Sequence, residues 1–129
     1  MKKFTELIKA YDDFMAIGAA NEYKIDEAER ELGLKFSEEY KAFLREYGTA
    51  SANGHEFFGI CDSKRLNIVE MTLNAWKENS NVPRDLYLIE DVGIDKIYTW
   101  QNKEGQLFQT IANGIPEKIQ NTLCEYVAI

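Results

Sequence analysis

Apolar side chains recur every three or four residues along much of the chain, which is the spacing of helices that bury one face. Near the start this pattern predicts a helix over about residues 2–16, with Asp12 and Asp13 opposite its apolar stripe. We therefore expect the domain to begin with a helix that packs against a core.

Residues 25–48, IDEAERELGLKFSEEYKAFLREYG, predict two more helices, because each apolar stripe lies between a start signal and a stop signal. Asp26 stands at an N-cap position, and Glu29 follows at the spacing of a capping box. Ser37 is the expected cap of the second helix, which Gly48 is expected to end.

The next stretch passes from small, polar residues to β-like and then helical patterns. Residues 49–56 predict a loop with a turn at Asn53-Gly54, and residues 57–60 predict a short strand. Helical spacing returns over residues 67–79, where Asn67 is the expected N-cap.

The last third predicts an antiparallel meander and a closing helix. Three runs predict strands, Leu86–Glu90, Lys96–Gln101 and Gln106–Ile111, and Pro116 marks the expected start of a last amphipathic helix. Helices at the N-terminus, in the middle and at the C-terminus would then flank a mainly antiparallel central sheet, which is an α+β fold. We predict a single domain over residues 1–129.

Composition supports a globular domain, because 45% of the 129 residues are apolar and 29% are charged. No apolar run reaches the roughly 20 residues that cross a membrane, and the first residues form no apolar signal core. We expect a complete, cytoplasmic protein without a membrane segment. In that compartment Cys61 and Cys124 are expected to be reduced thiols, and a disulfide between them stays open as the alternative.

The net charge of −7 makes nucleic acid an unfavourable partner, because an acidic domain repels phosphate backbones. The same charge attracts a basic protein. A simpler interpretation also stays open, in which moderate negative charge keeps the domain in solution.

Few residues are candidates for catalysis. His55 is the single histidine, and no nucleophile signature accompanies it. Zinc sites take three or four His or Cys ligands at close spacing, which one histidine and two distant cysteines do not provide. No glycine-rich phosphate loop is present. We predict an exposed loop histidine, no metal, no cofactor and no enzymatic activity.

Acidic side chains concentrate in residues 85–95, which hold four acids and no base. Glu90, Asp91 and Asp95 surround the expected turn between two strands. Neighbouring strand residues point to opposite faces, so Glu90 and Asp91 are not expected to form one facing pair. A solvated loop, a partner-binding patch and a catalytic carboxylate pair all stay open as interpretations.

Two aromatic residues share one face of the following strand, Tyr98 and Trp100. If that face packs under helices, both belong to the core. If it is the open face of the sheet, the two rings beside the acidic turn would form an anchor-rich surface of the kind that binds proteins.

The residue types at positions 25–48 are more specific than their periodicity. The pattern I-x-x-A-E-x-E-L-G-x-x-F-x-x-E-Y-K-x-F-L-x-x-Y-G resembles the opening of the SUKH superfamily, and a later "F-F-G" strand and "x-Y-x-W" strand continue the resemblance along nearly the whole chain. The family commonly has a proline where this chain has Ser37, which is itself a good cap.

The resemblance implies a bacterial immunity protein that binds and neutralises a cognate toxin domain, often a nuclease, without chemistry of its own. Fungal relatives imply an alternative, a regulatory or scaffolding module that binds an endogenous signalling or cell-envelope protein. For the interface we predict Glu90, Asp91 and Asp95, with Tyr98 and Trp100 if they are exposed, on grounds of charge and not of the family.

Overall fold

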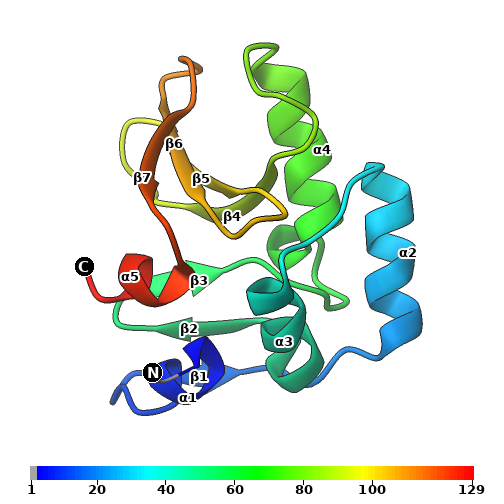
Figure 1. Ribbon diagram of the computed structural model, residues 1–129, viewed down its shortest axis with the longest axis vertical. Helices are drawn as coiled ribbons and strands as arrows, with labels where there is room; N and C mark the ends of the chain where they lie inside the picture. Colours follow the sequence, from blue (N-terminus) through cyan, green and yellow to red (C-terminus); the bar gives the residue numbers. More distant parts are fainter. Residues whose placement is uncertain (1–2) are drawn as a thin grey trace.

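The computed structural model describes residues 3–129, and in that part of the chain five α-helices accompany two antiparallel sheets (Figure 1). The α+β class is confirmed, although two sheets take the place of the one expected. The elements are α1 (Phe4–Ile8), β1 (Met15–Ala16), α2 (Glu22–Leu32), α3 (Glu38–Tyr47), β2 (Ala50–Ala52), β3 (His55–Phe57), a short 3-10 turn (Lys64–Leu66), α4 (Ile68–Glu78), β4 (Tyr87–Asp91), β5 (Ile97–Gln101), β6 (Leu107–Ile111), β7 (Glu117–Gln120) and α5 (Leu123–Val127).

The larger sheet has the order β4-β5-β6-β7, so each strand pairs with its neighbour in sequence. Its first three strands begin and end within one residue of the predicted runs. Residues of β5 pair in register with β6, from Ile97 opposite Ile111 to Gln101 opposite Leu107. An irregularity between Leu88 and Glu90 shifts the register of β4 against β5.

The smaller sheet has the order β1-β2-β3 and was not expected as a sheet. The turn predicted at Asn53-Gly54 is confirmed, because Ala52 pairs with His55 across it and both turn residues have positive φ. β2 lies in the stretch that predicts a loop, because it consists of the small residues Ala-Ser-Ala, which carry little apolar periodicity. The strand predicted over residues 57–60 overlaps β3 only at Phe57, so it is placed too late in the chain.

The helix over residues 25–32 begins earlier than expected. Its N-cap is Asn21, whose side chain accepts from the Lys24 amide at 2.9 Å, so Asp26 lies inside the helix. Glu29 forms no capping box and instead accepts the Phe36 amide at 2.8 Å, which fixes the link to α3. The predicted Ser37 cap is confirmed, since its hydroxyl accepts the Tyr40 amide.

The first and last helices are shorter than predicted. After Ile8 the chain continues in tight turns and then in β1, so the helix does not reach residue 16. At the other end Pro116 precedes strand β7 and not a helix, because this segment pairs with β6. The closing helix α5 starts at Leu123, where Thr122 caps it by accepting the Glu125 amide.

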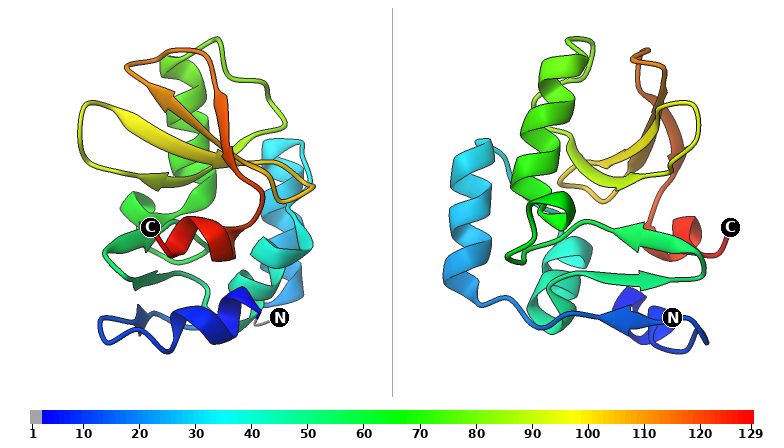
Figure 2. Two further views of the ribbon diagram at one scale, coloured as in Figure 1. Left: turned by 60° about the vertical axis from the view of Figure 1, so that its left-hand side comes forward. Right: turned by 180° about the vertical axis from the view of Figure 1, so that it is seen from behind.

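Two helices are layered on one side of the larger sheet, with α4 against β4 and α2 beyond α4 (Figures 1 and 2). The two sheets meet where the Phe58 amide donates to the Ile89 carbonyl at 2.9 Å. The glycine of the F-F-G motif is needed nearby, because a Cβ on Gly59 would lie 1.8 Å from the Gly48 carbonyl oxygen. The turn between β4 and β5 projects from this body (Figure 2, left).

Two further expectations concern the cysteines and membrane-spanning helices. Cys61 and Cys124 are both half-buried and do not form a disulfide. Across residues 3–129, none of the helices has the length and apolar character that crossing a bilayer requires.

Candidate protein-binding site

Strand β4 sends its last two side chains to opposite faces of the sheet. Asp91 is exposed, whereas Glu90 lies inside the protein with only 5% of its surface accessible. The expectation that these acids do not form a facing pair is therefore confirmed. The prediction that Glu90 lies on the interaction surface is wrong, because its side chain points toward α5 and the smaller sheet, where hydrogen-bond donors surround it.

The two aromatic residues of β5 differ in exposure. Trp100 is 0% exposed and donates its indole N–H to the Thr110 hydroxyl at 3.1 Å, so it belongs to the core and cannot touch a partner from there. Tyr98 is half-buried, with its ring edge-on to Trp100. Partial burial, followed by the negative charges of Glu78 and Asp91, raises the pKa of the Tyr98 hydroxyl.

The projecting turn places apolar side chains next to acids. Its tip is a two-residue turn, closed by the hydrogen bond that the Ile97 amide donates to the Ile94 carbonyl at 3.0 Å. Asp95 and Lys96 occupy its centre at φ 53° and 54°, as a type I′ turn requires. Ile94 is 61% exposed, and Val92 before it is also exposed. A water-exposed isoleucine of this size at a turn tip is available to a partner.

A second turn lies beside the first. The Ala112 amide donates to the Lys96 carbonyl at 3.2 Å, and Ala112 itself has φ 51°. Ile111, paired with Ile97 across the strands, is 59% exposed. We refer below to the turn surface, which consists of residues from both turns and the adjoining strands: Asp91, Val92, Ile94, Asp95, Tyr98 and Ile111. Asp91 and Tyr98 pair across β4 and β5 and share one face of the sheet, whereas Ile111 leaves β6 on the opposite face.

Left-handed backbone at residues other than glycine, asparagine and aspartate costs roughly 1 kcal/mol or more per residue. Two such residues, Lys96 and Ala112, lie in the two turns that carry the turn surface. Strain of this kind concentrates at functional sites, because elsewhere a less strained residue can replace it. The strain thus marks the same place as the exposed isoleucines and the acids.

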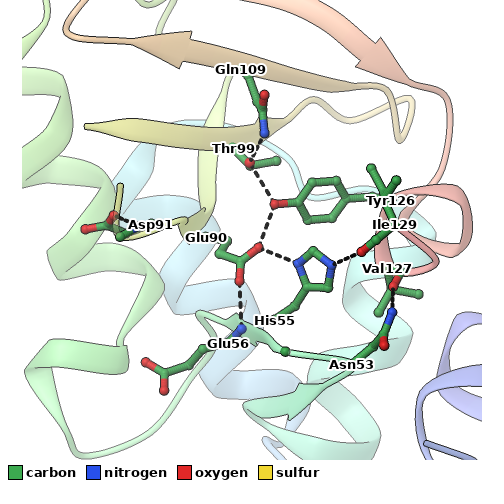
Figure 3. A network of polar contacts seen from close by, with 12 residues as sticks. Asn53, His55, Glu56, Glu90, Asp91, Thr99, Gln109, Tyr126, Val127 and Ile129 are labelled. Atoms are coloured by element: carbon green, nitrogen blue, oxygen red, sulfur yellow. Dashed lines mark hydrogen bonds and ion pairs between the residues drawn. The ribbon is translucent and has the colours of Figure 1, made fainter. Parts of the chain in front are cut away.

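Behind the turn surface, Glu90 is the centre of a polar network (Figure 3). Its Oε1 accepts from His55 Nδ1 at 2.8 Å and from the Tyr126 hydroxyl at 2.6 Å, while Oε2 accepts the Glu56 amide at 2.7 Å. These donors come from β3 and α5, so one carboxylate joins both sheets to the last helix. Asp91 points away from the network in Figure 3.

The direction of the remaining hydrogen bonds follows from counting protons. Tyr126 has one hydroxyl proton, which it donates to Glu90, so the Thr99 hydroxyl donates to Tyr126 at 2.9 Å. Gln109 then donates its amide N–H to Thr99 at 3.1 Å. Burial and the Glu90 charge raise the pKa of the Tyr126 hydroxyl well above its usual range, so this hydroxyl keeps its proton. The series of hydrogen bonds from Gln109 through Thr99 and Tyr126 therefore ends on the Glu90 carboxylate.

His55 differs from the exposed loop histidine that was predicted. It lies on β3 with a side chain 15% exposed, in contact with the rings of Phe57 and Tyr126. The hydrogen bond to Glu90 raises the pKa of His55, with help from the Glu90 charge and the Ile129 carbonyl, whereas burial lowers it. Both ring nitrogens are engaged, Nδ1 with Glu90 and Nε2 with the Ile129 carbonyl at 3.3 Å.

This arrangement suits structure better than catalysis. A general base needs a lone pair that can reach a substrate, and a nucleophile needs such a base within hydrogen-bond distance. In the network the oxygens of Glu90 and the nitrogens of His55 face protein groups. Within residues 3–129, no three His, Cys, Asp or Glu side chains are placed to hold a metal ion.

A second buried network surrounds Ser37. Its backbone N–H donates to the Tyr87 hydroxyl at 2.8 Å, and its hydroxyl donates to the side-chain carbonyl of Gln101 at 3.0 Å. The Gln101 amide in turn donates to Glu39, which also accepts the Leu123 amide at the start of α5. Burial raises the pKa of the Glu39 carboxyl, against the hydrogen bonds that it accepts.

These observations define the class of protein. It is an α+β domain whose buried polar networks hold the fold together and whose exposed turn carries apolar and acidic side chains. A comparison with known families matches residues 1–128 to the family described as SUKH_5, SMI1-KNR4 cell-wall. The chain belongs to this family, which confirms the resemblance in residues 25–48. Proteins of this family are, broadly, immunity proteins or SMI1/KNR4-like regulators and are generally not enzymes. A comparison with curated proteins finds no match.

Sequence reasoning identified the acids of the turn but missed its apolar residues. The expected turn between the two strands contains Val92 and Ile94. An isoleucine in a turn that no helix covers is itself a signal of an exposed apolar side chain. The partnership of His55 with Glu90 left no such signal, because 35 positions of sequence separate the two residues.

Proposed function

We propose that this protein is an immunity protein that binds a cognate bacterial toxin domain, a nuclease, and neutralises it by stoichiometric protein–protein inhibition in the cytoplasm. Membership of the SUKH family supports this class of function. The turn surface is the observation that carries the proposal, since it combines exposed isoleucines, two acids and a partly exposed tyrosine on one projection.

The acids and the apolar residues of this surface have separate roles in the proposal. A nuclease must hold phosphates and so tends to be basic, and Asp91 and Asp95 attract it over a distance and speed association. Ile94 and Ile111 exclude water once the complex has formed, and buried apolar anchors of this kind slow dissociation. The protein itself performs no reaction in this account.

The test starts with capture of the partner from cells that carry the gene, at about 50 and 500 mM salt, followed by mass spectrometry. Screening over this range weakens exposed electrostatic attraction strongly. The proposal expects a basic toxin domain in stoichiometric amount, held less well at high salt. An envelope or signalling protein in its place would favour the regulatory alternative and contradict the immunity proposal.

The captured partner then allows a kinetic test of the turn surface. Reversing Asp91 and Asp95 to lysine is expected to lower the association rate by about tenfold at low salt. Reversing Glu31 and Glu104, two exposed acids away from this surface, changes the net charge equally and serves as the control. Equal rates for the two double variants would remove the turn surface from the interface.

Substitution Ile94→Ala tests the apolar role. It is expected to raise the dissociation rate by roughly tenfold and to leave association nearly unchanged, because truncation removes buried contacts without altering charge. A complex that dissociates at the wild-type rate would show that the isoleucine stays outside the interface.

A further inference from the structure

The single histidine of the chain joins three parts of the fold. His55 reaches β4 through Glu90 and the end of the chain through the Ile129 carbonyl. Two positions earlier, on the same hairpin, Asn53 donates its side-chain amide to the Val127 carbonyl at 2.7 Å. The hairpin thus holds residues 123–129, here named the α5 segment, at two backbone carbonyls (Figure 3).

Both ring nitrogens of His55 face oxygen acceptors. A neutral imidazole carries one N–H, so one of its nitrogens would turn a lone pair toward an oxygen. The imidazolium ion carries two N–H groups and donates to Glu90 and to Ile129 at once. Glu90 is 5% exposed, so its charge is poorly screened and favours a cation beside it.

We propose that His55 is a pH-operated clasp, which holds the α5 segment against both sheets while the ring is protonated and loosens it when the ring loses a proton. The proton leaves from Nε2 to water, so the bond to Ile129 is lost first. The attraction between the ring and Glu90 then falls from that of an ion pair to that of a single hydrogen bond.

The charged groups around the ring favour the closed state. Glu90 faces it from β4, and Asp13 contributes a more distant negative charge from the turn before β1. From α5 the neutral ring of Tyr126 packs against it, while the Tyr126 hydroxyl donates to Glu90. The carboxylate of Asp13 accepts the amides of Asn53 and Gly54 at 2.6 and 2.8 Å, so it is fixed beside the hairpin.

The sign of the pH effect follows from linkage. Because folding raises the pKa of His55, the clasp contributes its full stability below about pH 6.5, the usual histidine value. That contribution is lost as the pH rises through the higher pKa of the folded protein. The α5 segment therefore opens more easily on the neutral to alkaline side.

Nuclear magnetic resonance on the intact protein tests the clasp, and the single histidine makes its titration unambiguous. Two quantities are followed from pH 5.5 to 9: the ring proton shifts of His55 and the exchange protection of the Tyr126 amide, which donates to Thr122 at 3.1 Å. Exchange rates are corrected for their intrinsic pH dependence. Protection is expected to fall between about pH 6.5 and the folded-state pKa of His55 and then to level off. The total fall is about tenfold for each unit by which that pKa exceeds 6.5.

The variant His55→Gln keeps an amide donor toward Glu90 but cannot titrate, so its Tyr126 protection is expected to stay flat with pH. A fall in this variant equal to that in the wild type would overturn the clasp. The wild-type titration decides the matter alone if the variant does not fold. A His55 pKa at or below 6.5, or protection that ignores it, would also overturn the proposal.

Discussion

Glu90 and Asp91 are neighbours on β4 whose side chains leave the strand on opposite faces. Glu90 accepts three hydrogen bonds inside the protein, and Asp91 accepts the Gly93 amide at the surface at 2.8 Å. One step along the chain therefore separates a carboxylate that organises the fold from a carboxylate that is free to meet a partner.

Paired substitutions test this division of roles. Glu90→Ala is expected to lower the free energy of unfolding by about 3–5 kcal/mol, because it leaves His55, Tyr126 and a backbone amide without their acceptor. Asp91→Ala is expected to change it by no more than about 0.5 kcal/mol. Urea unfolding of both variants measures the difference, and equal costs would contradict the placement of Glu90.

Ser37 stands where the resemblance to the family predicts a proline. The backbone φ of −66° at this position suits proline, but proline has no N–H for Tyr87 and no hydroxyl for Gln101. Ser37→Pro is expected to lower stability by about 2–4 kcal/mol, because the buried Tyr40 amide loses its cap and Tyr87 and Gln101 each lose one of their hydrogen bonds. Ser37→Ala keeps the backbone N–H, so its free energy of unfolding is expected to lie between those of the wild type and Ser37→Pro. Urea unfolding of the three proteins measures this order.

Several helix caps and turns, which depend on neighbouring residues, could be predicted from the sequence, whereas contacts between residues distant in sequence could not. The cap at Ser37, the cap at Asn67 and the turn at Asn53-Gly54 depend on neighbours within four residues, and the structure confirms all three. Placing Glu90 beside His55 requires knowing how two sheets meet. The sequence pattern carries no information about that contact.

Among the elements, those with strong periodicity were predicted well. The strands β4, β5 and β6 and the helices α3 and α4 lie where the patterns placed them. Two of the errors fall on segments whose periodicity was overridden by tertiary contacts. The segment before β1 leaves its helix, and Asp13 then binds the hairpin amides. The segment after Pro116 pairs with β6 as a strand although its apolar spacing suits a helix.

The two adjacent turns carry strain that a substitution can relieve. Lys96 is left-handed at φ 54°, which glycine adopts without cost. Lys96→Gly is expected to raise the free energy of unfolding by about 0.5 kcal/mol, after the added freedom of the unfolded chain is subtracted. Lys96→Val is expected to lower it by about 1 kcal/mol or more. Thermal unfolding checks both signs, and a stabilising valine would contradict the assigned backbone.

For the whole molecule, charge and architecture support the same function. A net charge of −7 favours a basic partner, and the polar networks that contain His55, Glu90 and Glu39 connect elements of the fold to one another. The turn surface is a projection where apolar and acidic groups meet water together. Its acids could be chosen from sequence, but its isoleucines and the burial of Trp100 became visible only in the fold.

Titration of the captured toxin domain's catalytic activity with this protein tests the central claim most directly. If the protein is a stoichiometric inhibitor, activity falls linearly and reaches zero at one molecule of this protein per molecule of toxin. The variant Asp91→Lys/Asp95→Lys, mixed for a short time at low salt, is expected to reach the same end point more slowly. Full toxin activity in the presence of excess, folded protein would contradict the account.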